Sequence, residues 1–249
     1  MKVTRVTDAV HMVTGTNVNW ALITDGDAVT VVDAGYPNDG KALLASIEAV
    51  GRRPQDVAAV VLTHAHLDHM GGIPTLLAAH PVPVLTGEAE VAHAHRDHLE
   101  QIGPVEMLRQ CRHRAGLVWV AQTLRAVLPH ASMKVPQAEA APYDVPLDLP
   151  GGLVPVATPG HTTGHTAYLL PSEGVVFAGD ALATAHPLLP GGPRPQLLPG
   201  FFSEDEEQML ASLRTMGRLP ADVLVPGHGP VERRAMAEVV DEVVARGGR

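Results

Sequence analysis

The sequence predicts an α+β fold, a four-layer αββα sandwich that carries a helical insertion. Three observations lead to this prediction. The two halves of the chain alternate strand and helix patterns in a similar order. Several strand patterns end in glycine next to histidine or aspartate, and helical patterns dominate the stretch between the halves. A chain of 249 residues can bury a sizeable core, so we expect residues 1–249 to form a single domain, with residues 88–140 as the insertion.

Strands dominate the N-terminal half. Apolar and β-branched runs predict strands near 2–7, 10–14, 18–24, 28–32, 57–62 and 82–86. Asp25-Gly26-Asp27 is a strong hairpin signal between the third and fourth of these strands. Helices are predicted at about 39–50 and near 73–80.

The C-terminal half repeats this alternation. Strands are predicted near 153–157, 166–170, 174–178 and 222–225. The run Ser203-Glu204-Asp205-Glu206 has the pattern of a capping box, which predicts a helix from there to about 217. A last helix is predicted over about 230–246.

Within the insertion, residues 88–130 predict two or three helices. Their apolar residues cover most of the helix surface, which indicates burial. Three roles are consistent with this: packing against the sandwich, a cap that lines the substrate site, or a homodimer contact. The Pro- and Gly-rich stretch 185–200 predicts a loop near the site. In it, His186 and Arg194 are candidate contacts for an acidic substrate group, with a solvated loop as the simpler interpretation.

The densest chemical signal is the run Thr63-His64-Ala65-His66-Leu67-Asp68-His69. It follows a buried-strand pattern and precedes a turn signal, so it should form a tight loop at the end of a strand. Neutral imidazole binds Zn, Cu, Fe and Ni, and a carboxylate adds a hard anionic ligand. Such a loop could aim His64 and His66 at one ion and turn Asp68 and His69 toward a second.

A second histidine cluster, His93-Ala94-His95-Arg96-Asp97-His98, repeats this spacing in a different context. Good helix formers flank it on both sides, so we expect it to lie on a helix. On a helix His93 and His95 are about 200° apart around the axis and cannot hold one ion together. We therefore interpret this cluster as part of a solvated or pocket-rim helix.

Three further segments place a histidine or an aspartate just after a predicted strand and beside glycine. They are Pro159-Gly160-His161, Gly179-Asp180 and Gly227-His228. Glycine allows the backbone to approach a metal closely. One such segment alone would indicate a turn or a cap. Together with the His64–His69 loop, they indicate a shared metal site.

With these residues in this order, the chain resembles the metallo-β-lactamase superfamily over nearly its whole length. The resemblance implies the αββα sandwich with a binuclear metal site at one edge. It implies that His64, His66 and His161 hold the first metal. It implies that Asp68, His69 and His228 hold the second metal and that Asp180 bridges both. It also implies that Asp33, after the strand 28–32, braces the ligand loop without touching metal. His165 has no metal role in this pattern and is interpreted as structural.

The implied chemistry is metal-dependent hydrolysis. Two cations held about 3.5–4 Å apart can bridge one hydroxide, which attacks a carbonyl carbon. We expect zinc, two ions per chain, with Mn or Fe as alternatives, and a small ester, thioester or lactone as the substrate. Asp68 is the candidate catalytic residue, as a proton shuttle. A mononuclear-iron persulfide dioxygenase stays open as an alternative, as does a β-lactam or phosphodiester hydrolase on the same fold.

Composition restricts the partners. A net charge of −9 without a basic stripe argues against nucleic-acid binding, and no apolar run is long enough to indicate a membrane segment. We therefore expect a small-molecule substrate. The N-terminus runs directly into a strand pattern without a signal peptide, which predicts a cytoplasmic location.

Overall fold

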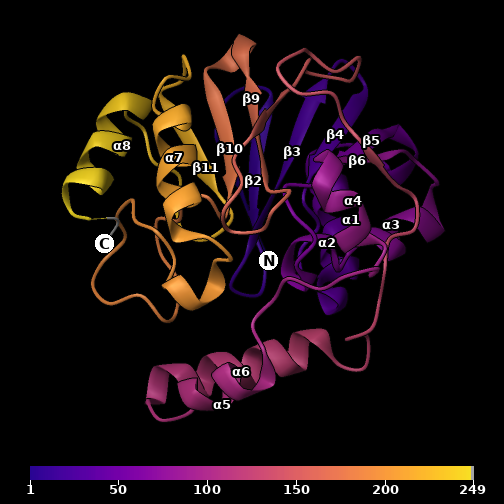
Figure 1. Cartoon of the computed structure of the whole chain (residues 1–249). Helices are drawn as coiled ribbons and strands as arrows, with labels where there is room; N and C mark the ends of the chain where they lie inside the picture. The colour runs from indigo at the N-terminus through magenta and orange to yellow at the C-terminus, as the bar shows by residue number, and fades with distance from the viewer. Residues whose placement is uncertain (248–249) are drawn as a thin grey trace.

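Two β-sheets packed face to face form the centre of the molecule, and helices cover both outer faces (Figure 1). The computed structural model describes residues 1–247. The first sheet contains, in chain order, β1 (Lys2–Arg5), β2 (Val10–Thr14), β3 (Asn19–Asp25), β4 (Ala28–Val32), β5 (Val57–Val61), β6 (Val84–Thr86) and β7 (Ala138–Ala140). The second contains β11 (Val223–Pro226), β10 (Val175–Gly179), β9 (Thr166–Leu170) and β8 (Val154–Ala157), in that order. The αββα sandwich predicted from the sequence is confirmed.

Alternation along the strands builds three apolar layers. In β3, Trp20 belongs to the core under the helices of the first sheet, whereas Ile23 packs between the two sheets. In β10, Phe177 packs between the sheets and Val176 lies under the helices of the second sheet. The covering helices are α1 (Gly40–Ala49) and α3 (Ile73–Ala79) on the first sheet, and α7 (Glu206–Met216) and α8 (Met236–Ala245) on the second.

Two predicted helix starts are wrong. The last helix, α8, begins at Met236 rather than near 230, because Glu232 pairs with Leu224 of β11 through two backbone hydrogen bonds. The residues before α8 therefore extend the sheet edge. The cap of α7 is Asp205, whose side chain accepts a hydrogen bond from the Gln208 N–H at 2.9 Å, rather than Ser203.

The segment predicted as a helical insertion is only partly helical. It contains α4 (Val91–Ala94), α5 (Pro104–Gln110) and α6 (Arg114–Val127), but it ends in β7, which pairs with β6 in parallel. The second histidine cluster does not lie on one continuous helix. The helix α4 ends at Ala94, and Arg96 adopts a φ of 65°, which breaks the helical path.

Helices α5 and α6 lie side by side below the two sheets (Figure 1). The Asn38 amide anchors α6 by donating to the Arg125 carbonyl at 2.6 Å and the Leu128 carbonyl at 3.0 Å. Leu108 and Leu117 are exposed on this pair of helices, and a homodimer contact here stays a prediction. Among the described residues, no helix has the length and apolar character needed to cross a bilayer.

Candidate metal centre

Parallel strands bring the predicted site residues to one edge of the sandwich. The strands β4 and β5 are parallel neighbours, so Asp33 and the His64–His69 loop follow at the same end of the first sheet. The strands β10 and β11 are also parallel, which places Asp180 and His228 together at the end of the second sheet. The chain folds this way because each strand is a short apolar run followed by glycine or a polar turn.

The structure brings all seven predicted ligands together in three overlapping groups. Within each group, one potential ligand atom per residue lies within 4.8 Å of the others. The groups are His64, His66 and His161; His64, His69 and Asp180; and Asp68, His69 and His228. The His64–His69 segment carries four of these side chains, and its second half forms a short helix, α2 (Leu67–Met70), which the sequence did not predict.

Asp180 occupies the middle of this cluster. Its carboxylate oxygens lie 3.2 Å from Nε2 of His69, 3.2 Å from Nε2 of His228 and 3.5 Å from Nε2 of His161. Its backbone N–H donates to Nε2 of His165 at 3.1 Å. His165 in turn contacts Thr158 Oγ1 through Nδ1 at 2.8 Å. His165 thus fixes the backbone of Asp180, and its own ring nitrogens are both used.

Two glycines make this close packing sterically allowed. A Cβ at Gly227 would lie 2.4 Å from Asp180 Oδ1, and a Cβ at Gly179 would lie 2.6 Å from His165 Nε2. Gly179 also has a φ of 49°. Any side chain at either position would displace the groups around Asp180.

Hydrogen bonds at the outer edge of the cluster fix the direction of the histidine rings. Nδ1 of His69 contacts Asp33 Oδ2 at 2.8 Å, and Nδ1 of His228 contacts the Asn17 carbonyl at 2.6 Å. Nε2 of His66 contacts the Glu100 carbonyl. In each ring the nitrogen that makes this contact faces outward, so the other nitrogen faces the cluster.

Unpartnered buried atoms support the fit of a metal. Among the described residues, His64 Nε2 is buried and makes no hydrogen bond, and His69 Nε2 and Asp180 Oδ1, which lie 3.2 Å apart, are buried without a well-aligned one. Buried polar atoms are nearly always paired, and leaving one unpaired costs about 1–3 kcal/mol. Imidazole nitrogens and carboxylate oxygens are the ligands that zinc and similar divalent cations accept. The donor set therefore fits such cations.

The two ends of the cluster differ electrostatically. Burial, together with neighbouring imidazoles, holds the pKa of His64 and His161 well below the usual value. Burial also acts to lower the pKa of His69, but Asp180, Asp33 and Asp68 outweigh it and raise that pKa well above the usual value. Asp180 likewise raises the pKa of His228 against the effect of burial. In the metal-free protein, these shifts favour the neutral form of His64 and His161 and the protonated form of His69.

This difference predicts where metal binding releases protons. A group with a raised pKa binds its proton below that pKa, so a cation must displace the proton from His69 and, near neutral pH, from His228. Binding to Asp68, His69 and His228 should release protons and weaken as the pH falls, whereas binding to the other group should not. Zinc calorimetry in buffers of different ionisation enthalpy measures this. Equal proton release in both binding steps would contradict the assignment.

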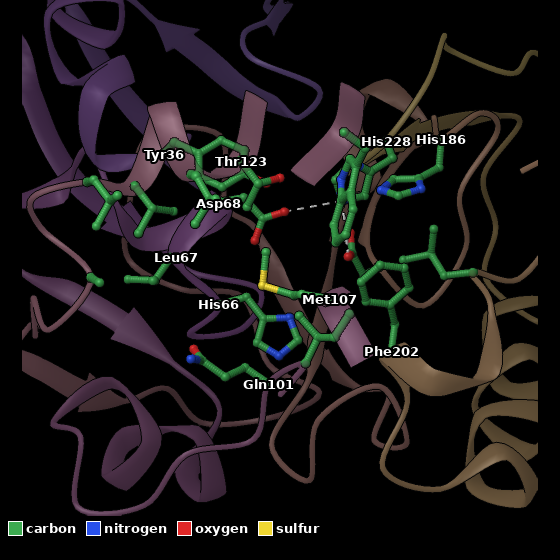
Figure 2. A pocket seen from close by; sticks show the side chains of 18 residues that line it. Tyr36, His66, Leu67, Asp68, Gln101, Met107, Thr123, His186, Phe202 and His228 are labelled. Carbon is green, nitrogen blue, oxygen red and sulfur yellow. Dashed lines mark hydrogen bonds and ion pairs between the residues drawn. The ribbon is translucent and has the colours of Figure 1, made fainter. Parts of the chain in front are cut away.

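A cavity of about 230 Å³ opens onto the cluster (Figure 2). One end is formed by candidate ligands, namely His66, Asp68, Asp180 and His228. The walls are mostly apolar and come from the insertion and from the chain near residue 200, with Met107, Trp119, Leu124, Val127, Leu198 and Phe202 as the main contributors. Neither lysine nor arginine is among the described residues that line it.

His186 belongs to the wall of this cavity rather than to a solvated loop. Its ring centroid lies 5.9 Å from that of Trp119, 5.4 Å from that of Phe202 and 5.1 Å from that of His228. Burial lowers the pKa of His186 to about 3, so it is neutral. Arg194 does not line this cavity; it lines a different one beside Gln196. Neither residue can therefore offer a cation to an acidic substrate group at the site.

Several residues of the site carried no signal in the sequence. Tyr36 lines the cavity from an irregular segment and Phe202 from a short 3-10 helix (Gly200–Phe202), and neither segment carries a chemical motif. Trp119 was visible only as one apolar residue in a helical pattern. Glu90 lies just before the second histidine cluster and Arg96 within it, yet both reach the His64–His69 loop. These residues reach the site through contacts between segments that are far apart in the chain, which local sequence patterns do not indicate.

The family model described as the metallo-beta-lactamase superfamily matches residues 13–228. The chain belongs to this superfamily. The match spans both halves of the sandwich, including every candidate ligand from His64 to His228.

Relatives of this superfamily member include hydrolases. The uncharacterized protein YobT of Bacillus subtilis is 27% identical over 228 residues, which are 88% of each chain. A hydroxyacylglutathione hydrolase of Cupriavidus metallidurans is 32% identical over 212 residues, covering 84% of this chain but only 61% of that enzyme. The solved Rm3 metallo-beta-lactamase matches with a TM-score of 0.68 at 19% identity, over 98% of this chain and 91% of that one. The family match and these relatives support a metallo-hydrolase of the superfamily.

Proposed function

We propose that this protein hydrolyses a small, uncharged ester, thioester or lactone with two zinc ions. His64, His66 and His161 would hold one ion, Asp68, His69 and His228 the other, and Asp180 both. Two such cations lower the pKa of a bound water to about 7 and polarise a carbonyl oxygen. The observation that carries the proposal is the convergence of unpartnered imidazole and carboxylate atoms at the end of an apolar cavity.

Asp68 is the residue that would move a proton during the reaction. Its side chain is 18% exposed and faces the cavity, whereas the Asp180 side chain is 4% exposed. Figure 2 shows Asp68 and His228 at the same end of the cavity, with Asp68 Oδ2 3.5 Å from His228 Nε2. A carboxylate that reaches both the metal ligands and the substrate space can accept a proton from the attacking water and pass it to the leaving group.

The cavity walls support an uncharged substrate. No lysine or arginine among the described lining residues is placed to pair with an anionic group of the substrate, and the charge of the proposed cations, partly offset by Asp68 and Asp180, would be confined to the inner end. Leu124 and Leu128 line the cavity although they are 45% and 53% exposed. Exposed leucines at a cavity mouth favour a substrate whose apolar group extends along α6. A thioester of glutathione, which carries carboxylates, suits this cavity less well than a neutral ester or lactone.

A substrate panel tests this proposal. The zinc-loaded protein should hydrolyse neutral esters or lactones with a higher kcat/KM than a hydroxyacyl thioester of glutathione. Leu124→Lys, at the cavity mouth, should shift the preference toward the anionic substrate by about 5-fold, as expected for roughly 1 kcal/mol at a partly exposed site. Leu117→Lys is the matched control, since Leu117 is similarly exposed on the same helix but does not line the cavity.

Elemental analysis separates the hydrolase from the oxygenase alternative. Two equivalents of zinc with ester or lactone hydrolysis support the proposal. One equivalent of iron with oxygen consumption on a persulfide would replace it with a mononuclear oxygenase. No metal after supplementation, or no hydrolysis across the panel, would reject it.

A further inference from the structure

Ala65 lies between the candidate ligands His64 and His66, and charged side chains hold both of its backbone polar groups. Its N–H donates to Glu90 Oε1 at 2.7 Å. Its carbonyl accepts a hydrogen bond from Arg96 Nη1 at 3.1 Å. The peptide path between the two histidines is therefore tied to the segment that carries the second histidine cluster.

Glu90 also reaches the loop of the third histidine of this group. Its Oε2 accepts a hydrogen bond from Thr162 Oγ1 at 2.7 Å, and Thr162 directly follows His161. Its Oε1 contacts Nδ1 of His93 at 2.7 Å. One fully buried carboxylate thus connects two ligand loops that are far apart in the chain.

Glu100 makes a parallel connection on the outer side. Its carboxylate accepts hydrogen bonds from the N–H and the hydroxyl of Thr163, both at 2.8 Å. Its carbonyl contacts Nε2 of His66. A Cβ at Gly164 would lie 2.2 Å from the Glu90 nitrogen, so the two segments pack in direct backbone contact.

The three hydrogen bonds of Glu90 favour the ionised form of its carboxylate. Burial acts to raise its pKa, but the hydrogen bonds from His93, Thr162 and Ala65 outweigh this and lower the pKa below its usual value. A carboxylate can accept from all three donors, whereas a protonated one would direct a hydrogen at one of them. Within the described chain, the Glu90 side chain makes no hydrogen bond to Asp68, His69 or His228.

We propose that Glu90 is a positioning residue that sets the geometry of the three-histidine group formed by His64, His66 and His161, and that it acts on this group alone. The inference rests on the proposed metal function. It assigns a role to the second histidine cluster: His93 orients Glu90, and Glu90 orients the ligand loops. Groups that orient metal ligands typically change metal affinity by about 10–100-fold when they are removed.

Zinc titration of the apo-protein by calorimetry tests the inference, with circular dichroism to verify folding. Glu90→Ala should weaken one of two zinc sites by about 10–100-fold and leave the other unchanged. Glu90→Gln should stay close to wild type, because its amide oxygen can accept from Ala65 and His93 while its NH₂ donates to Thr162. Glu88→Ala is the matched control, an exposed glutamate on the same turn.

A double variant identifies the affected site. If Glu90 acts only on the three-histidine group, adding Glu90→Ala to His66→Ala should cause no further loss at the remaining site. If Glu90→Ala does not fold, Thr162→Val replaces it in the test, because it keeps the side-chain shape and removes only the hydrogen bond from Thr162 to Glu90. Thr162→Val should weaken the same zinc site to a smaller extent. Unchanged affinity in a folded variant, or equal weakening of both sites, would overturn the role of Glu90. If the wild-type protein bound no zinc, that result would instead contradict the proposed function.

Discussion

Asp180→Asn should leave the protein folded but reduce its zinc content toward one ion per chain. The carboxylate lies within 3.5 Å of three candidate ligand histidines, so it is placed to contact both ions. Asparagine keeps the shape and removes the charge that offsets repulsion between two divalent cations. The Asp68, His69 and His228 group should weaken most, because it contains fewer histidines.

Hydrolytic activity should fall at least ~100-fold in Asp180→Asn, because the stabilisation that one metal gives a transition state is worth several kcal/mol and each ~1.4 kcal/mol is tenfold. The thermal midpoint of the apo-protein should change much less than activity, since three apolar layers hold the sandwich independently of the ions. Asp241→Asn, at an exposed site on α8, is the control. Two equally tight zinc sites in Asp180→Asn would show that Asp180 does not bridge the ions.

The fold could be predicted from local patterns because both sheets are buried on both faces. Short β-branched runs that end at glycine or at a polar residue marked β4, β5, β10 and β11, and their parallel pairing follows from the helices between them. The helix starts that were wrong, at α7 and α8, depend on contacts outside the local sequence. Glu232 continues a strand because β11 offers a free edge, which no local pattern reveals.

The candidate ligands were predictable for a different reason. Several histidines and aspartates, each following a strand, form a pattern that few other structures require, and in each of the three groups the structure gathers the ligand atoms within 4.8 Å of one another. The apolar cavity and the Glu90 connection were not predictable. Trp119 and Phe202 come together only after α6 packs below the sheets, and Glu90 contacts Ala65 and Thr162 across long stretches of chain.

His66→Ala should remove one metal ion and most of the activity, whereas His95→Ala should do neither. Both residues belong to histidine clusters of the same spacing. His66 places Nδ1 3.1 Å from Nε2 of His161 and lines the cavity, so its loss opens the three-histidine group without creating a closed void in the core. Among the described hydrogen bonds, the side chain of His95 makes one, from Nε2 to the Ala138 carbonyl at 3.1 Å.

His93→Ala is expected to give an intermediate result, which makes the comparison decisive. The spacing alone suggested that His93 and His95 are equally remote from metal, but His93 is buried against Glu90 and His95 is not. Metal content measured by elemental analysis should therefore fall most in His66→Ala, partly in His93→Ala, and not in His95→Ala. Activity should follow the same order, with a loss of at least ~100-fold for His66→Ala. If His95→Ala depleted the metal while His66→Ala kept it, the ion would lie at the second histidine cluster, and the cavity beside Asp68 would not be the active site.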